Sequence, residues 1–144
     1  AARLSYTAIG DNVNLASRLE GANKAYGTYI LISESTRLGA GDAIEVRELD
    51  YVKVKGKNLP IRVYELLGLK GETATNLLEK ARLFEAALPL FRERRFAEAA
   101  EAFKRVVSKH GEDHACENYL ERCEIYLKEP PPADWDGSHA LTEK

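Results

Sequence analysis

A chain of 144 residues has room for one ordinary domain or two small ones. Hydrophobic residues make up 44% of the chain and charged residues 31%, a balance that is typical of globular proteins. The net charge of -2 does not indicate a protein that binds nucleic acid or another polyanion, so we expect no nucleic-acid partner. No apolar run approaches the roughly 20 residues that a membrane-spanning helix needs.

The first predicted feature is a short strand, a tight turn and a helix in Tyr6–Glu20, with the sequence YTAIGDNVNLASRLE. Gly10 permits the turn, and Asp11 is a good N-cap for the helix that follows. Asn14 and Arg18 are four residues apart and therefore lie on one face of that helix. The amide can donate and accept hydrogen bonds, and the guanidinium suits phosphate oxygens. A helix with a surface arginine and an incidental asparagine explains the same spacing.

Strands and short helices alternate in the next segment, which indicates an α+β fold. We expect a helix over 12–25, a strand over 28–32, a short helix capped by Ser33 and ending near Gly39, and strands over 43–49, 51–55 and 59–67. Half a sheet of this kind would leave an open edge and an uncovered apolar face. Lys53, Lys55 and Lys57 alternate and so share one strand face. A solvated face with a turn at Gly56 accounts for that pattern equally well.

The second part of the chain is predicted to be helical and begins near 69–75, where the β-rich pattern ends. Residues 1–70 hold 10 basic and 8 acidic side chains and residues 71–144 hold 11 and 15, so the two parts carry charges of +2 and -4. Apolar residues spaced by three or four predict helices over 76–94 and 96–109, and Asp113 is a credible N-cap for a third. Pro89 should kink the first helix or remove a hydrogen bond from it. The third helix has an apolar face made of Cys116, Tyr119, Leu120, Cys123 and Leu127.

The cysteines and histidines give little indication of a metal site. Cys116 and Cys123 are expected to be reduced core residues rather than a disulfide or metal ligands. His110, His114 and His139 share no metal-like spacing. Three prolines at 130–132 exclude a continuing helix and favour an extended tail. We expect the single tryptophan, Trp135, to anchor that tail on the protein.

The Tyr6–Glu20 string resembles the second half of the catalytic domain of class III nucleotidyl cyclases, where the pattern is roughly Tyr-Thr-x-Ile-Gly-Asp-x-Val-Asn-x-Ala-x-Arg-Leu-Glu. The resemblance implies the closing half of a ferredoxin-like α+β sandwich. It implies that Asn14 orients the ribose and helps to position the attacking 3′-oxygen. It also implies that Arg18 stabilises negative charge on the phosphates in the transition state. Thr7 occupies the position at which the family recognises the purine, and threonine there favours ATP.

The segment VKVKGKNLP is similar to a family segment whose first lysine reaches the triphosphate, which makes Lys55 the first candidate for a phosphate ligand and Lys57 the second. In the family, the active site is shared across a homodimer interface. One subunit supplies the aspartates that bind Mg²⁺ or Mn²⁺, and the other supplies the residues equivalent to Thr7, Asn14, Arg18 and Lys55. The chain contains no methionine and opens shortly before the motif, so we expect a fragment that lacks the metal ligands and is inactive alone.

Residues 83–126 resemble a tetratricopeptide-like helical repeat. The resemblance lies in RRFAEAAEAFKRVV, in which the small Ala99 and Ala100 are flanked by Phe96 and Phe103. Such a unit needs neighbours, so we expect it to pack on the cyclase region or on another chain. A plain helical extension without partner specificity is the alternative. With the tail, this part is similar to C-terminal extensions of bacterial membrane-anchored adenylate cyclases, which implies a cytoplasmic segment of a membrane-tethered parent.

These expectations define three segments: 1–70, the C-terminal half of a cyclase catalytic domain; 71–129, the helical module; and 130–144, the extended tail with its prolines and tryptophan. The predicted function is that of an adenylate cyclase fragment, from an enzyme that converts ATP into 3′,5′-cyclic AMP and pyrophosphate. One alternative is a helical interaction module with a protein partner, attached to a degenerate cyclase half. Guanylate cyclase is a further alternative, separated from the first only by Thr7 and by residues outside the chain.

Overall fold

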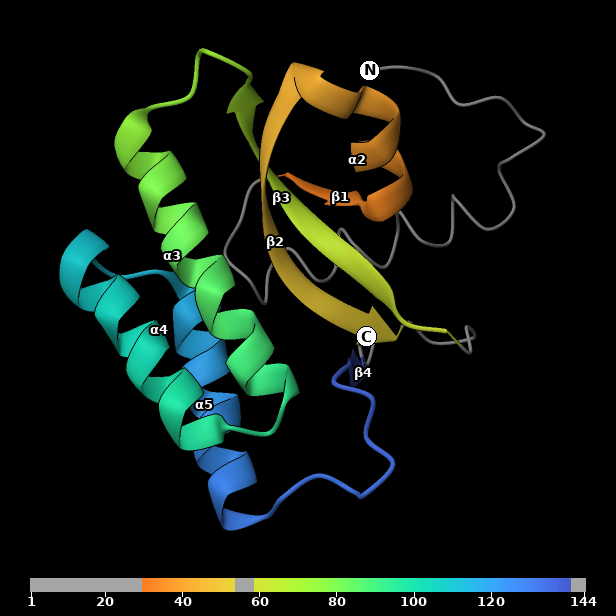
Figure 1. Ribbon diagram of the computed structural model, residues 1–144, viewed down its shortest axis with the longest axis vertical. Helices are drawn as coiled ribbons and strands as arrows, with labels where there is room; N and C mark the ends of the chain where they lie inside the picture. Colours follow the sequence, from red (N-terminus) through yellow and green to blue (C-terminus); the bar gives the residue numbers. More distant parts are fainter. Residues whose placement is uncertain (1–29, 54–58, 141–144) are drawn as a thin grey trace.

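The computed structural model describes residues 30–53 and 59–140 of the chain. Over these residues the protein forms a four-stranded sheet, a short helix on one side of it and three long helices on the other (Figure 1). The predicted α+β class is therefore confirmed. The helix expected over 12–25 lies outside the described residues, as do the first two residues of the strand expected over 28–32.

The sheet is built around a long antiparallel pair, β2 (Ile44–Lys53) and β3 (Ile61–Leu69). Two short strands flank this pair in the order β1-β3-β2-β4. Strand β1 (Leu31–Ser33) pairs antiparallel with β3, whereas β4 (His139–Ala140) pairs parallel with the end of β2. The C-terminal tail therefore returns to the sheet after the helices, an arrangement that the sequence did not predict.

Strand β2 corrects the prediction of two separate strands over 43–49 and 51–55. It is a single strand, and its register with β3 shifts between Glu48 and Asp50. The shift is a β-bulge that accommodates one extra residue, Leu49, without ending the strand. As a result, Leu49 and Asp50 are both buried although they are neighbours in sequence. Strand β3 also begins and ends two residues later than the predicted 59–67.

The short helix α2 (Glu34–Ala40) confirms the prediction that Ser33 begins a helix. The Ser33 hydroxyl accepts a hydrogen bond from the Thr36 N–H at 3.2 Å, and Glu34 places a negative charge in the first turn. Gly41, with φ of 58°, ends the helix in a conformation that favours glycine. A 3₁₀ turn, η2 (Gly41–Ala43), then leads directly into β2.

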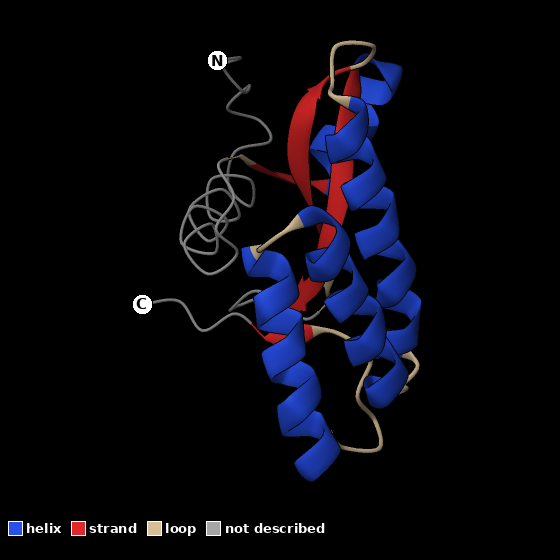
Figure 2. Cartoon of the chain, turned by 90° about the vertical axis from the view of Figure 1, so that its left-hand side faces the viewer, coloured by secondary structure: helices blue, strands red, loops and turns tan. Residues whose placement is uncertain are grey.

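The three long helices are α3 (Thr75–Arg92), α4 (Phe96–His110) and α5 (His114–Lys128), and they lie side by side (Figure 2). All three were predicted. The Asp113 carboxylate caps α5 by accepting from the Cys116 N–H at 3.1 Å. Helix α3 continues through Pro89 to Arg92. The predicted face of α5 is wrong at Leu127, which is 55% exposed, because Tyr126 continues the buried stripe and packs on Phe96.

The main hydrophobic core lies between these helices and includes Leu49 of β2. Its centre is aromatic: Phe84 of α3, Phe103 of α4 and Tyr119 of α5 contact one another with ring centroids 4.7–5.8 Å apart. A second, small cluster is formed by Val52 and Val63 within the sheet. The helices thus pack on the sheet of their own chain. None of the helices in the described ranges is long and apolar enough to cross a bilayer.

The outer edge of β2 is covered by polar side chains of the helices. Arg82 donates to the Val46 carbonyl at 2.7 Å, and Glu85 accepts from the Glu48 N–H at 2.7 Å. Further along, the Tyr119 hydroxyl lies 2.8 Å from the Leu49 carbonyl oxygen, and β4 pairs with the last two residues of β2. The edge that we expected to be open on this side of the half-sheet is therefore occupied.

Removing the Glu85 carboxylate tests this edge cover. Glu85→Ala should lower the free energy of unfolding by about 1–3 kcal/mol, because the Glu48 N–H then loses its acceptor. The control is Glu101→Ala, which removes a carboxylate that contacts only the exposed Lys104 among the described residues and should change stability far less. Urea denaturation measures both variants, and equal losses would contradict a specific role for Glu85.

Candidate functional site

The five residues predicted to bind nucleotide all lie outside the described residues. Thr7, Asn14 and Arg18 fall within 1–29, and Lys55 and Lys57 fall within 54–58. The structure therefore tests none of their roles. It does describe the strands that flank the lysine segment, since β2 ends at Lys53 and β3 begins at Ile61.

Lys53 is the one member of the alternating lysines that the structure describes. Its ammonium Nζ lies 3.5 Å from Oδ2 of Asp136, which belongs to the C-terminal tail. Both side chains are partly exposed, at 42% and 41%. This lysine thus contacts the tail, and it immediately precedes the segment in which Lys55 and Lys57 lie.

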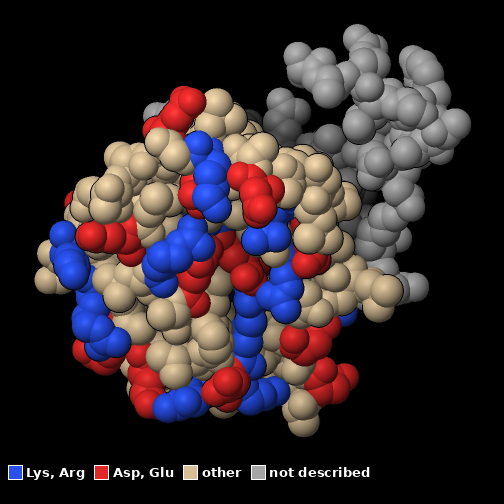
Figure 3. Space-filling view, turned by 45° about the horizontal axis from the view of Figure 1, so that its top comes forward, with Lys and Arg blue, Asp and Glu red and all other residues tan. Residues whose placement is uncertain are grey.

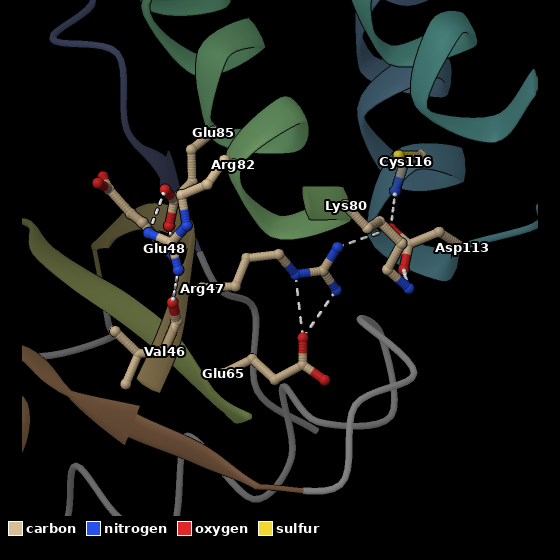
Figure 4. A network of polar contacts seen from close by, with 9 residues as sticks. All are labelled: Val46, Arg47, Glu48, Glu65, Lys80, Arg82, Glu85, Asp113 and Cys116. Carbon is tan, nitrogen blue, oxygen red and sulfur yellow. Dashed lines mark hydrogen bonds and ion pairs between the residues drawn. The ribbon is translucent and has the colours of Figure 1, made fainter. Parts of the chain in front are cut away.

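The best-defined polar cluster joins the sheet to the helices and is centred on Arg47 of β2 (Figure 4). The guanidinium donates to Glu65 of β3 at 3.0 Å and to Asp113 at 3.1 Å, and it lies 4.6 Å from the centre of the Phe84 ring. Its side chain is only 2% exposed. Because a buried cation is costly unless it is paired, these two carboxylates and the aromatic face hold Arg47 in one position.

Asp113 connects three elements through one carboxylate. Besides Arg47 of β2, it accepts from Lys80 of α3 at 3.3 Å and from the Cys116 N–H at the start of α5. Burial tends to raise the pKa of this carboxyl, but the charges of Arg47 and Lys80 and the hydrogen bonds outweigh it, so its pKa is lowered. The carboxylate is therefore charged throughout the neutral range.

A second group of charges lies along the same strand. Both Arg62 of β3 and Arg92 of α3 donate to Oε2 of Glu48, at 2.7 and 2.8 Å. Asp50, which is 1% exposed, accepts from the Tyr119 hydroxyl at 2.7 Å and from Arg122 at 2.8 Å. On the face shown in Figure 3, basic and acidic side chains are accordingly interspersed rather than gathered into a field of one sign.

The chemistry of this cluster suits positioning rather than bond making. Its charges are paired across the sheet–helix interface, and the described ranges contain no group of three side chains suited to hold a metal ion. Burial raises the pKa of the Cys116 thiol to about 12 and that of Cys123 to about 11. Both thiols are therefore neutral at pH 7 and poorly nucleophilic. Both cysteines are buried and free, as predicted.

Sequence reasoning missed the ion pairs of Arg47 and Asp50. The available indication was their position, because both charges interrupt an apolar strand at places that must face the interior. Asp113 was predicted only as a helix cap, and its longer-range partners, Arg47 and Lys80, could not be identified from local spacing.

Comparison with known proteins shows similarity to three adenylate cyclases. The chain is 46% identical to adenylate cyclase 1 of Rhizobium meliloti (strain 1021) over 67 residues, which is 46% of this chain and 10% of that protein. It is 48% identical to adenylate cyclase of Anabaena cylindrica over 67 residues, 44% of this chain and 13% of the relative. It is 32% identical over 127 residues to the terminal-differentiation specific adenylate cyclase of Dictyostelium discoideum, 84% of this chain and 6% of the relative.

These matches show a domain related to adenylate cyclases, and they confirm the expected similarity to nucleotidyl cyclases at that level. The chain spans between 6% and 13% of the length of these relatives. The Dictyostelium match covers too much of the chain to be confined to residues 1–70, so it extends into the helical region. No family model matches the chain, and no solved structure does.

Neutralising Asp113 tests the buried cluster. Asp113→Asn should lower the free energy of unfolding at pH 7 by about 3–5 kcal/mol, because Arg47 loses a buried counter-charge. A lowered native pKa gives stability that is present above the ordinary value of 3.8 and is lost as the pH falls through the native pKa.

The difference between Asp113→Asn and the wild type should therefore shrink in acid. Urea denaturation at pH 7 and again below pH 3.8 measures this change. Asp134→Asn, at an exposed site in the tail, is the matched control and should show neither effect. A pH-independent loss in Asp113→Asn would contradict the charge pairing.

Proposed function

We propose that the chain is part of a class III adenylate cyclase and contributes the nucleotide-binding half of its active site. The observation that carries the proposal is the Tyr6–Glu20 string, with Asn14 and Arg18 at the spacing that the reaction requires. The similarity to proteins named adenylate cyclase supports it independently. In the proposed reaction, ATP gives 3′,5′-cyclic AMP and pyrophosphate.

The reaction is an intramolecular displacement at the α-phosphorus. The ribose 3′-oxygen forms a bond to this phosphorus and loses its proton, and the bond to the bridging oxygen of pyrophosphate breaks. Asn14 orients the ribose so that the 3′-oxygen is aligned for attack, and alignment of this kind removes a large entropic part of the barrier. Arg18 donates to the phosphate oxygens as their negative charge is redistributed.

The remaining contacts bind the substrate. The Thr7 hydroxyl contacts the purine edge and favours adenine over guanine. Lys55, and secondarily Lys57, supplies a flexible positive charge to the triphosphate. These roles follow the family resemblance residue by residue, and they place every contact on the purine, ribose and phosphates in residues 7–57.

Divalent cations and the second subunit belong to the parent enzyme in this proposal. The described residues do not fit a Mg²⁺ or Mn²⁺ site, since they offer no group of three suitable side chains, and no step is assigned to such an ion here. We propose that a homodimer completes the active site, with metal-binding aspartates from the other subunit. A chain that contributes only the nucleotide side is then inactive alone.

The helical part is proposed to be a tetratricopeptide-like extension of a ferredoxin-like cyclase half. Its support is the packing of α4, in which Ala99 and Phe103 are fully buried and Phe96 is 5% exposed. The Dictyostelium match also extends into this region. We further propose, from the resemblance to bacterial membrane-anchored cyclases, that the membrane anchor of the parent lies outside this chain.

Substitution of the two motif residues tests the reaction. In a protein that includes the upstream half of the catalytic domain, Asn14→Ala and Arg18→Ala should each lower kcat for cyclic AMP formation by about 10²-fold, because each removes a contact made in the transition state. The assay uses Mn²⁺ with ATP and, separately, GTP. Arg105→Ala, on the surface of α4, is the control and should retain full activity.

The outcomes of this assay separate the candidate functions. Cyclic GMP in place of cyclic AMP would overturn the role of Thr7 and leave the mechanism standing. No cyclic nucleotide from a folded, dimeric wild type would overturn the proposal and favour an interaction module.

The lysines provide a matched pair for the phosphate contact. Lys55→Gln should raise the KM for ATP, because a point charge at the triphosphate is lost while the length of the side chain is nearly kept. Lys57→Gln should have a smaller effect. Steady-state kinetics measure both, and a KM that is unchanged in Lys55→Gln but raised in Lys57→Gln would reverse the assignment.

A further inference from the structure

We propose that the C-terminal tail, residues 130–140, positions the end of β2 and so determines how tightly the lysine segment that follows it binds nucleotide. This inference rests on the proposed function, because it assigns a determinant of affinity to the same nucleotide site. The tail would thereby connect the helices, on which it is anchored, to the substrate.

The first part of the tail is held by the turn between α3 and α4. Arg94 in this turn has a φ of 69°, which is uncommon outside glycine. Its guanidinium donates to the carbonyls of Pro131 and Pro132 and lies 5.6 Å from the centre of the Trp135 ring. Pro131 is buried. One side chain thus fixes the prolines and the tryptophan together.

Trp135 anchors the middle of the tail, as the sequence predicted. Its ring packs against Phe91 of α3, Phe96 of α4 and Tyr126 of α5, with centroids 5.5–5.8 Å apart. The indole N–H donates to the Ser138 carbonyl at 2.8 Å, which folds the following residues back toward the sheet. The tail is therefore attached to all three helices by one aromatic side chain.

The end of the tail reaches β2 where the strand ends. His139 pairs with Val52 and Ala140 with Lys53 in parallel register, and Asp136 forms an ion pair with Lys53. Gly137 makes the turn between these contacts with a φ of 89°, and a Cβ at this position would lie 3.3 Å from Cγ of Arg92. Both the backbone conformation and the close approach require glycine here.

A second set of contacts fixes the same end of β2 from the helix side. Asp50, two residues before Val52, is held by Tyr119 and Arg122 of α5. Burial and the nearby Arg122 lower the pKa of His139, and Asp50 opposes this shift, so the imidazole is neutral at pH 7. The tail thus adds a neutral strand and one ion pair to an end of β2 that α5 already holds.

The position of these contacts gives the tail its proposed role. They end at Lys53, one residue before the segment 54–58, in which the predicted phosphate ligands lie. Since consecutive residues of a chain cannot move independently, fixing the backbone of Lys53 restricts the positions that Lys55 can reach. Release of the tail would remove that restriction and weaken nucleotide binding without altering any group that contacts nucleotide.

Gly137→Val releases the tail without touching the helical core. The cost of a left-handed conformation in a residue with a side chain should weaken docking by about fivefold to thirtyfold. Gly111→Val is the matched control, because Gly111 also has a positive φ, 93°, but no described atom lies within 4 Å of its Cβ position. Far-UV circular dichroism verifies that both variants keep their helices.

Two readouts follow the release. Trp135 is the only tryptophan, so its fluorescence reports docking directly and should shift toward the red in Gly137→Val alone. Hydrogen exchange at the amides of Val52 and Lys53 should accelerate in the same variant. In the cyclase-competent protein, the KM for ATP should rise by up to the factor lost in docking, with kcat little changed.

Each result decides between the alternatives. Faster exchange together with a raised KM in Gly137→Val, and neither in Gly111→Val, would support the inference. A released Trp135 with unchanged exchange at β2, or with an unchanged KM, would overturn it. An equal fall of kcat and kcat/KM would overturn it as well, since a transition-state effect is not a positioning of bound substrate. A wild type without cyclase activity would overturn the proposed function, and the exchange data would still decide whether the tail holds β2.

Discussion

The outer edge of β2 is the constraint on which the rest of the described structure depends. An edge strand presents unpaired N–H and carbonyl groups, and these must be bonded or left to water. Here Arg82, Glu85 and Tyr119 bond to that edge, and β4 pairs with its last two residues. Because the partners come from α3, α5 and the tail, the sheet edge is complete only when the whole helical part has folded against it.

The buried charges make this arrangement specific. Apolar packing alone would tolerate several relative positions of helices and sheet, whereas Arg47 requires Glu65 from β3 and Asp113 from the start of α5 at once. Asp50 likewise requires Tyr119 and Arg122 of α5. Such pairs contribute little net stability after the loss of hydration, but a displaced helix would leave a charge buried without a partner. The interface therefore has one favourable geometry.

The sequence was sufficient for the local elements and insufficient for the contacts between them. Ser33 and Asp113 cap helices as predicted, because capping depends on the adjacent few residues. Asp50 suggested a strand break, since the bulge that keeps β2 continuous depends on packing against α5. The parallel pairing of His139 and Ala140 joins residues about 87 positions apart along the chain, and two residues carry no periodicity that could reveal it. The nucleotide contacts proposed from the family string, including Asn14, remain predictions because they lie outside the described residues.

The polar interface also bears on what the helices do. A repeat that exists to bind a partner would keep its conserved packing surface free, but the helices described here direct Arg82, Glu85, Lys80 and Arg92 at the sheet. The aromatic contacts of Trp135 then join the same helices to a tail that ends on β2. Helices with this many contacts to one strand act as a rigid support for it. Any signal that shifts them must therefore be transmitted to β2, and through β2 to the residues that follow Lys53.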